Sequence, residues 1–144
     1  MKKINPVPKK KKTKKKSFGL SDGTLSNLYR KAVKKNCGNK CIICGNKENL
    51  QCHHPIHRKV KVLRWDWRNG VTVCNPLDNK CHAYCDTIEG REKVRETIGE
   101  ENWKYIKDNE RVIFKDYIRN RGISETDWRI ELKKLLLSII NDYL

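Results

Sequence analysis

Residues 41–86 decide the fold of this chain, and they read CIICGNKENL (41–50), QCHHPIHRKV (51–60), KVLRWDWRNG (61–70), VTVCNPLDNK (71–80) and CHAYCD (81–86). This stretch carries six of the seven cysteines and all four histidines of the chain. Closely spaced cysteines are typical of a closed structural zinc site, whereas paired histidines with a further histidine and a carboxylate are typical of an open, catalytic metal site. The stretch therefore indicates a metal-dependent enzyme supported by a zinc knuckle.

The charge of the chain predicts a polyanionic partner. The 144 residues carry a net charge of +16, and nine lysines lie in residues 1–16, where no acid offsets them. The other 128 residues hold 24 basic and 17 acidic side chains, so they remain basic at +7. Nucleic acid binds such surfaces strongly because its counterions are released. We therefore expect a nucleic-acid partner and no small-molecule substrate.

The composition at the start of the chain differs from the rest. Residues 1–18 combine lysines with two prolines and little apolar mass, which predicts a disordered lysine-rich arm that adds phosphate contacts or serves as a targeting address. Residues 19–144 are of a length that fits a single domain. No run of 18 apolar residues and no secretory signal are present, so we expect no membrane span and a cytoplasmic location. Seven cysteines in such a reducing compartment indicate metal ligands and spare thiols.

Hydrophobic spacing predicts a mixed α+β fold. Residues 22–36 form an amphipathic pattern that Asp22 or Thr24 could cap and Gly38 could end. Short strands are expected at 50–54 and 71–73, with the Asn69-Gly70 turn signal before the second strand and a helix starting near Lys80.

The last third of the chain is helical in pattern. One helix is expected around Trp103 and Ile106, and a second over 112–118, ending at Gly122. A third begins with a capping box, Ser124 to Asp127, and runs to Tyr143. We expect a motif core at 37–90 and a helical C-terminal extension at 91–144.

The zinc knuckle begins at Cys41 and Cys44, two thiols with a glycine directly after them. Cys74 and Cys81 are the best second pair, although the segment 76–79 must then loop out. Cys85 lies four residues after Cys81 and could replace it as the fourth ligand.

The histidines predict a second metal site. If His53 and His54 lie on a strand, their side chains point to opposite faces, so the two have different roles. His82 and Asp86 lie one helical turn apart and could share an ion with His53. Three protein ligands would leave positions open for water and substrate.

Together these residues resemble the HNH, or His-Me finger, endonucleases of phages and mobile elements. The resemblance covers residues 41–86 and rests on the paired histidines, on Asn69 fifteen residues after His54, on Cys74 five residues later, and on a histidine directly after Cys81. It implies a ββα-metal core in an HNH nuclease domain, the cytosol of a bacterium or of a phage-infected host, and a DNA substrate. The products would carry 5′ phosphates and 3′ hydroxyls.

The resemblance also implies residue roles. His54 would be the general base, and Asn69 would orient its imidazole through the side-chain amide or the backbone. One catalytic divalent ion, Mg²⁺, Mn²⁺, Ni²⁺ or Zn²⁺, would be held by His53, His82 and Asp86, beside a structural Zn²⁺.

Several neighbouring residues complete the expectation. Arg58, Arg64 and Arg68 lie between the two expected strands, where they could grip DNA phosphates. His57 is a rival ligand or base, interpreted here as a phosphate contact or bystander, and Trp65 is expected in the core. Two alternatives remain open: a zinc-ribbon nucleic-acid binding protein without catalysis, and a recombination nuclease that cuts branched DNA.

Overall fold

The computed structural model describes residues 19–75 and 80–142, which form an α+β fold with six helices and a two-stranded antiparallel sheet. The expected arm at 1–18 and the loop at 76–79 lie outside these residues. The last helix was expected to run to Tyr143, but it ends earlier, at Ile140. The elements are, in order, α1 (Asp22–Asn36), β1 (Leu50–His53), a short 3-10 helix η1 (Lys61–Leu63), β2 (Val71–Cys74), α2 (Cys81–Tyr84), α3 (Ile88–Ile98), α4 (Glu100–Asp108), α5 (Phe114–Arg121) and α6 (Glu125–Ile140).

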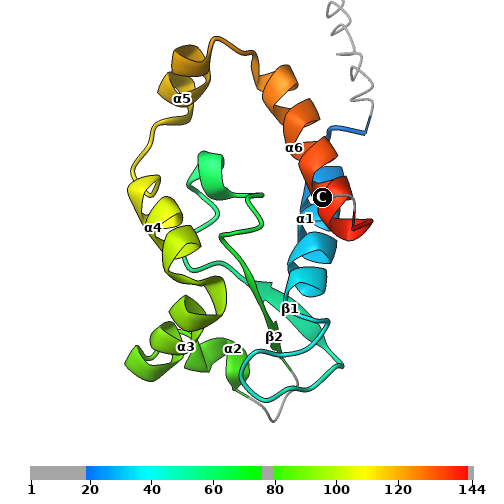
Figure 1. Cartoon of the computed structure of the whole chain (residues 1–144), viewed down its shortest axis with the longest axis vertical. Coiled ribbons are helices and arrows are strands. Elements are labelled where there is room, and N and C mark those ends of the chain that lie inside the picture. The colour runs from blue at the N-terminus through cyan, green and yellow to red at the C-terminus, as the bar shows by residue number, and fades with distance from the viewer. Residues whose placement is uncertain (1–18, 76–79, 143–144) are drawn as a thin grey trace, which may run out of the picture.

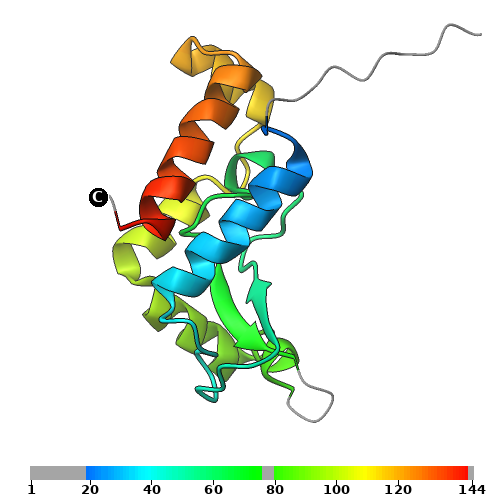
Figure 2. The same ribbon diagram turned by 90° about the vertical axis from the view of Figure 1, so that its right-hand side faces the viewer.

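Helix α1 has the bounds that its spacing predicted, but its cap differs. The Ser21 side chain accepts a hydrogen bond from the Thr24 amide, so Ser21 caps the helix, not Asp22 or Thr24. Leu25, Tyr29 and Val33 are buried along one face. This face packs against α6, which runs beside α1 in the same direction (Figures 1 and 2).

The sheet is a single antiparallel pair in which Leu50 faces Cys74 and His53 faces Val71. All four residues of β2 are buried, because α1 contacts the strand from one side and α2 and α3 contact it from another. The expected strand 50–54 ends one residue early, at His53, so His54 begins the loop that leads to η1.

The expected helix near Lys80 is short. Helix α2 covers only Cys81–Tyr84, and a separate helix, α3, follows after the Thr87 cap. The Gly90 backbone lies against the Tyr84 carbonyl, where a side chain would clash, so a glycine allows α3 to fold back closely on α2.

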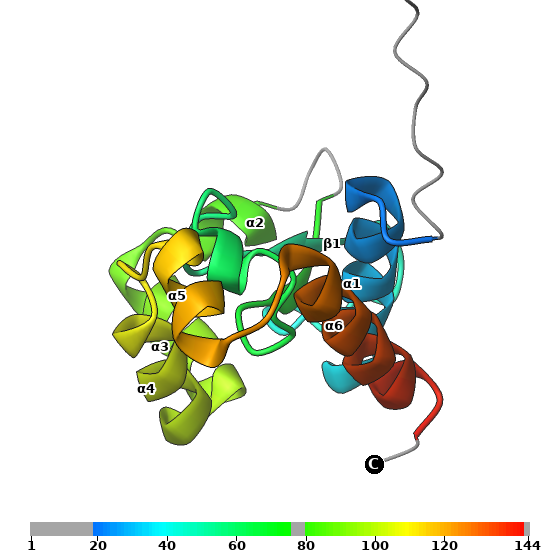
Figure 3. The same ribbon diagram turned by 90° about the horizontal axis from the view of Figure 1, so that it is seen from above.

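The helical C-terminal third is confirmed with small shifts. Helix α4 contains Trp103 and Ile106, whereas α5 starts at Phe114, and Ile113 before it is extended and exposed. The capping box between Ser124 and Asp127 is present and starts α6. Figures 1 and 3 show α3 and α4 on one side of the sheet and α1 and α6 on the other. No helix in the described ranges has both the length and the apolar character that a membrane span needs.

Candidate metal centre and histidine cleft

The first cysteine pair lies in a tight turn after α1. The Gly45 amide donates to the Cys41 carbonyl at 2.9 Å, and Gly45 has φ of 76°, a conformation that favours glycine. The Ile42 amide donates to the Thr72 carbonyl at 3.0 Å, which ties the turn to β2. The turn therefore carries Cys41 and Cys44 to the end of the strand where Cys74 lies.

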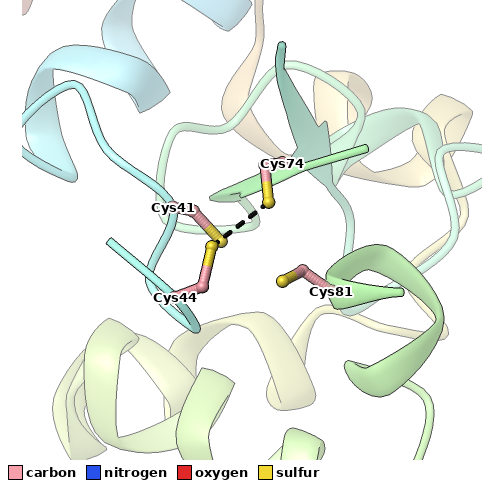
Figure 4. Close-up of side chains that lie close together, drawn as sticks. All are labelled: Cys41, Cys44, Cys74 and Cys81. Carbon is pink, nitrogen blue, oxygen red and sulfur yellow. Dashed lines mark hydrogen bonds between the residues drawn. The ribbon is translucent and has the colours of Figure 1, made fainter. Parts of the chain in front are cut away.

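Four thiols gather at this point. The sulfur atoms of Cys41, Cys44, Cys74 and Cys81 all lie within 4.8 Å of one another, and those of Cys44 and Cys74 are 3.3 Å apart. Figure 4 shows the four side chains directed into one space, from the turn, from β2 and from the start of α2. A tetrahedral zinc site with Zn–S bonds of about 2.3 Å separates its sulfurs by about 3.8 Å. The four cysteines thus fit a structural metal ion such as zinc.

The fourth ligand in this group is Cys81. Cys85 is buried one helical turn later, but its thiol is not part of the group. This geometry therefore favours Cys81 over Cys85 as the fourth ligand.

The environment of the thiols also suits a cation. Burial raises the pKa of Cys41, but hydrogen bonds from the backbone at Cys44 and Cys74 outweigh it and lower the pKa to about 7. Burial, followed by the interaction with the Cys44 thiol, raises the pKa of Cys74, and burial, followed by the interaction with the Cys74 thiol, raises the pKa of Cys81. Since crowded buried thiols resist successive ionisation, a divalent cation would supply the missing positive charge.

The predicted catalytic ligands are neighbours. His53 ends β1 and is buried, and its ring lies 5.2 Å from that of His82 on α2, edge to face. Burial lowers the pKa of His53, the nearby His82 lowers it further, and Asp86 acts in the opposite direction. Among the described residues, however, the four cysteines are the one group of three or more ligand side chains gathered tightly enough for an ion. In the positions that they have here, His53, His82 and Asp86 do not form such a group.

His54 has a different environment from His53. Its ring stacks on the ring of Tyr29, with centroids 4.9 Å apart and planes 20° apart. Burial lowers the pKa of His54 to about 4, while a hydrogen bond with the backbone of Arg64 opposes this shift. The imidazole is therefore neutral near neutrality, the form that can accept a proton.

Asn69 is buried, but its amide does not have the role expected for it. The amide nitrogen donates to the carbonyls of Ile56 at 2.9 Å and Leu63 at 3.2 Å, and the amide oxygen accepts from the Ile56 amide at 2.9 Å. The side chain thus holds the loop between the strands. The Asn69 backbone carbonyl accepts a hydrogen bond from the Tyr29 hydroxyl at 2.7 Å, and the Tyr29 ring in turn stacks on His54.

A cleft of about 1070 Å³ joins these histidines to basic side chains. Its lining includes His53, His54, His82 and Asp86, together with Arg30, Arg58, Lys59 and Arg64. Arg58 is exposed and Arg64 is half-buried, donating to the Arg58 carbonyl at 2.9 Å. His57 is exposed at the cleft and accepts a hydrogen bond from the Lys59 amide.

Arg68 does not belong to this cleft. Its guanidinium forms two hydrogen bonds with the Asp66 carboxylate, at 2.9 and 2.7 Å, and lies 3.4 Å from the centroid of the Tyr105 ring. We therefore assign Arg68 a role in packing rather than the expected phosphate contact. Trp65 is 1 % exposed, as expected of a core residue.

Two cleft residues were not expected from the sequence. Tyr29 had a signal only as an apolar position of the first helix, and Arg30 follows it on the exposed side.

Comparison of the chain with models of protein families, with curated proteins and with solved structures returned no match.

Proposed function

We propose that this protein is a metal-dependent DNA endonuclease of the HNH type. The observation that carries the proposal is the basic cleft lined by His53 at the end of β1, by His54 directly after it and by His82 of α2, beside four clustered cysteines. The order strand, loop, strand, helix around that cleft agrees with the resemblance of residues 41–86.

In this proposal His54 is the general base. Its neutral imidazole takes a proton from the attacking water through the ring nitrogen that carries no hydrogen. His53, His82 and Asp86 would hold one divalent ion, which would neutralise the charge that develops on the departing 3′ oxygen. The products carry a 5′ phosphate and a 3′ hydroxyl.

The basic side chains of the cleft bind the DNA backbone. Arg58 and Arg64 grip phosphates on either side of the cut, and Arg30 of α1 adds a further contact. The four-cysteine site holds zinc and fixes β2 against α2, which keeps His82 close to His53.

The test is cleavage of supercoiled plasmid by the wild type and by His54→Ala and His57→Ala, with Mg²⁺ or Mn²⁺ and with chelator. We expect metal-dependent nicking or linearisation, lost in His54→Ala and retained in the matched control His57→Ala, with DNA binding kept in both. General-base catalysis contributes about 10²- to 10⁴-fold, so the loss should be of that order.

Other outcomes separate the alternatives. If His57→Ala lost cleavage and His54→Ala kept it, His57 would be the general base. Binding without cleavage of plasmid or of a four-way junction would favour a zinc-dependent binding protein, and cleavage of the junction alone would favour a branched-DNA nuclease.

A further inference from the structure

We infer that Tyr29, on a helix that precedes the strand–loop–strand–helix motif, is a positioning residue that holds the His54 imidazole in the orientation needed for proton transfer. The inference rests on the proposed function, since it assigns Tyr29 a part in the task proposed for His54. It adds a component from α1 to a site otherwise built from residues 41–86.

The first step is that Tyr29 itself is fixed. It is 2 % exposed, and its hydroxyl donates to the Asn69 carbonyl at 2.7 Å, across 40 residues of sequence. Burial, as the largest cause, raises the pKa of Tyr29 well above its usual value, so the hydroxyl keeps its proton and remains a donor. The phenol is therefore anchored at its far end.

Second, Gly70 leaves room for the hydrogen bond between the Tyr29 hydroxyl and the Asn69 carbonyl. A Cβ at Gly70 would overlap the Tyr29 hydroxyl and come within 2.8 Å of a Val33 methyl group. Glycine at position 70 thus lets the β2 backbone approach α1 closely enough for the bond to Asn69. The hydroxyl sits against the backbone of the segment that Asn69 braces.

The third step is the contact with His54. The two rings are nearly parallel, 20° apart in plane and 4.9 Å apart at their centroids. Stacking restricts the tilt of the imidazole plane. The ring nitrogens of His54 are therefore held in a defined plane at the cleft.

Packing alone would not require this arrangement. The ring of Tyr29 lines the cleft beside His54, whereas Leu25, one helical turn earlier, is fully buried in the same hydrophobic cluster and does not line the cleft. Leu25 is therefore a matched control for the loss of core volume without the loss of the stack.

The test compares steady-state cleavage by the wild type, Tyr29→Phe, Tyr29→Leu and Leu25→Ala, at a temperature where circular dichroism shows each variant folded. Since misplacing a reacting group can cost about 100-fold in rate, we expect Tyr29→Leu to lower kcat by about 10- to 100-fold with little change in KM. Tyr29→Phe keeps the ring and should recover most of kcat, and Leu25→Ala should cleave as the wild type does.

A second readout does not depend on cleavage. In proton–carbon NMR spectra, the ring current of Tyr29 should shift the His54 ring protons upfield of those of the exposed His57, with His54→Ala giving the assignment. The shift should persist in Tyr29→Phe and disappear in Tyr29→Leu.

The results that overturn the inference are distinct from those that overturn the proposed function. A wild-type kcat in folded Tyr29→Leu, with activity lost in His54→Ala, would remove the positioning role alone. A wild-type His54 signal at the position of His57 would do the same even if Tyr29→Leu does not fold. Cleavage unaffected by His54→Ala would overturn both.

Discussion

His53 and His54 are adjacent in sequence but differ in every contact that matters for chemistry. His53 lies in the strand and faces His82, whereas His54 lies just beyond the strand and stacks on Tyr29. A strand of alternating side chains explains why the two separate, and the end of the strand at His53 gives His54 the freedom of a loop residue. A ligand and a base can therefore come from neighbouring positions.

At the metal centre, Cys81→Ser and Cys85→Ser form a matched pair. Both thiols are buried on or next to α2, but only Cys81 belongs to the four-thiol group. We expect Cys81→Ser to lose its zinc and much of its fold, because structural zinc contributes about 10 kcal/mol or more in small zinc domains. Cys85→Ser should keep one zinc per chain. Zinc content by mass spectrometry and thermal melting will check this, and the reverse pattern would assign the ligand to Cys85.

Asn69 and Thr72 offer opposite effects on stability. Removing the Asn69 amide takes its hydrogen bonds away from the buried amide and carbonyl of Ile56, whereas the Leu63 carbonyl keeps a bond from the Asp66 amide. Each lost partner costs about 1–3 kcal/mol, so Asn69→Ala should lower the free energy of unfolding by at least about 2 kcal/mol.

The Thr72 hydroxyl, in contrast, is buried without a partner in the described part of the chain. Burying an unpaired hydroxyl costs roughly 1–3 kcal/mol, so Thr72→Val should leave stability unchanged or raise it. Urea denaturation measures both variants. A Thr72→Val protein clearly less stable than the wild type would mean that the hydroxyl has a partner in solution.

At the scale of elements, apolar spacing predicted the bounds of α1, although its Ser21 cap was missed, and a capping box with apolar spacing predicted the start of α6. Both patterns are local, since a serine cap and an apolar face are read within one helix. Helix α3 was not predicted as a separate element. It is polar, with Gly90 and Val94 its only buried residues, so its spacing carries little signal.

In the candidate site, too, the residues with a local sequence signal were predicted and the long-range contacts were not. The four-cysteine group was predicted from spacing, because sequence distance and turn residues limit the possible pairings. The contacts of Tyr29 with Asn69 and of Arg68 with Tyr105 were not predicted, because the partners are distant in sequence. Such contacts exist only once the helices pack.

Gly90 of α3 tests how closely α3 approaches α2, and Gly23 of α1 is the control. A Cβ on Gly90 would overlap the Tyr84 carbonyl and lie 2.9 Å from the Cα of Cys85, so Gly90→Ala should cost about 1–3 kcal/mol of stability. Gly23 in α1 has only the Ser21 hydroxyl at 4.0 Å, and Gly23→Ala should stabilise by up to about 1 kcal/mol. Thermal melting decides, and equal effects of the two substitutions would contradict the close packing of α3 on α2.

At the scale of the whole molecule, α1 connects the C-terminal helix α6 with the cleft. It packs on α6 through Leu25 and Val33 and lines the cleft through Tyr29 and Arg30. The ends of the two helices are tied by ion pairs, Arg129 to Asp22 at 2.8 Å and Lys35 to Asp142 at 2.7 Å. Helix α6 therefore stabilises α1, which lines the cleft. The cysteine site stabilises the end of the sheet.

The measurement that tests this account most directly is the metal dependence of DNA cleavage by zinc-loaded protein. The wild type and His54→Ala are passed over a chelating resin, their zinc content is determined, and Mn²⁺ or Mg²⁺ is then titrated in with supercoiled plasmid. We predict that both proteins retain one zinc per chain and bind DNA equally, and that only the wild type regains cleavage on addition of the second metal. Folded, zinc-loaded wild type that binds DNA but cleaves neither plasmid nor a four-way junction with Mg²⁺, Mn²⁺, Ni²⁺ or added Zn²⁺ would contradict it.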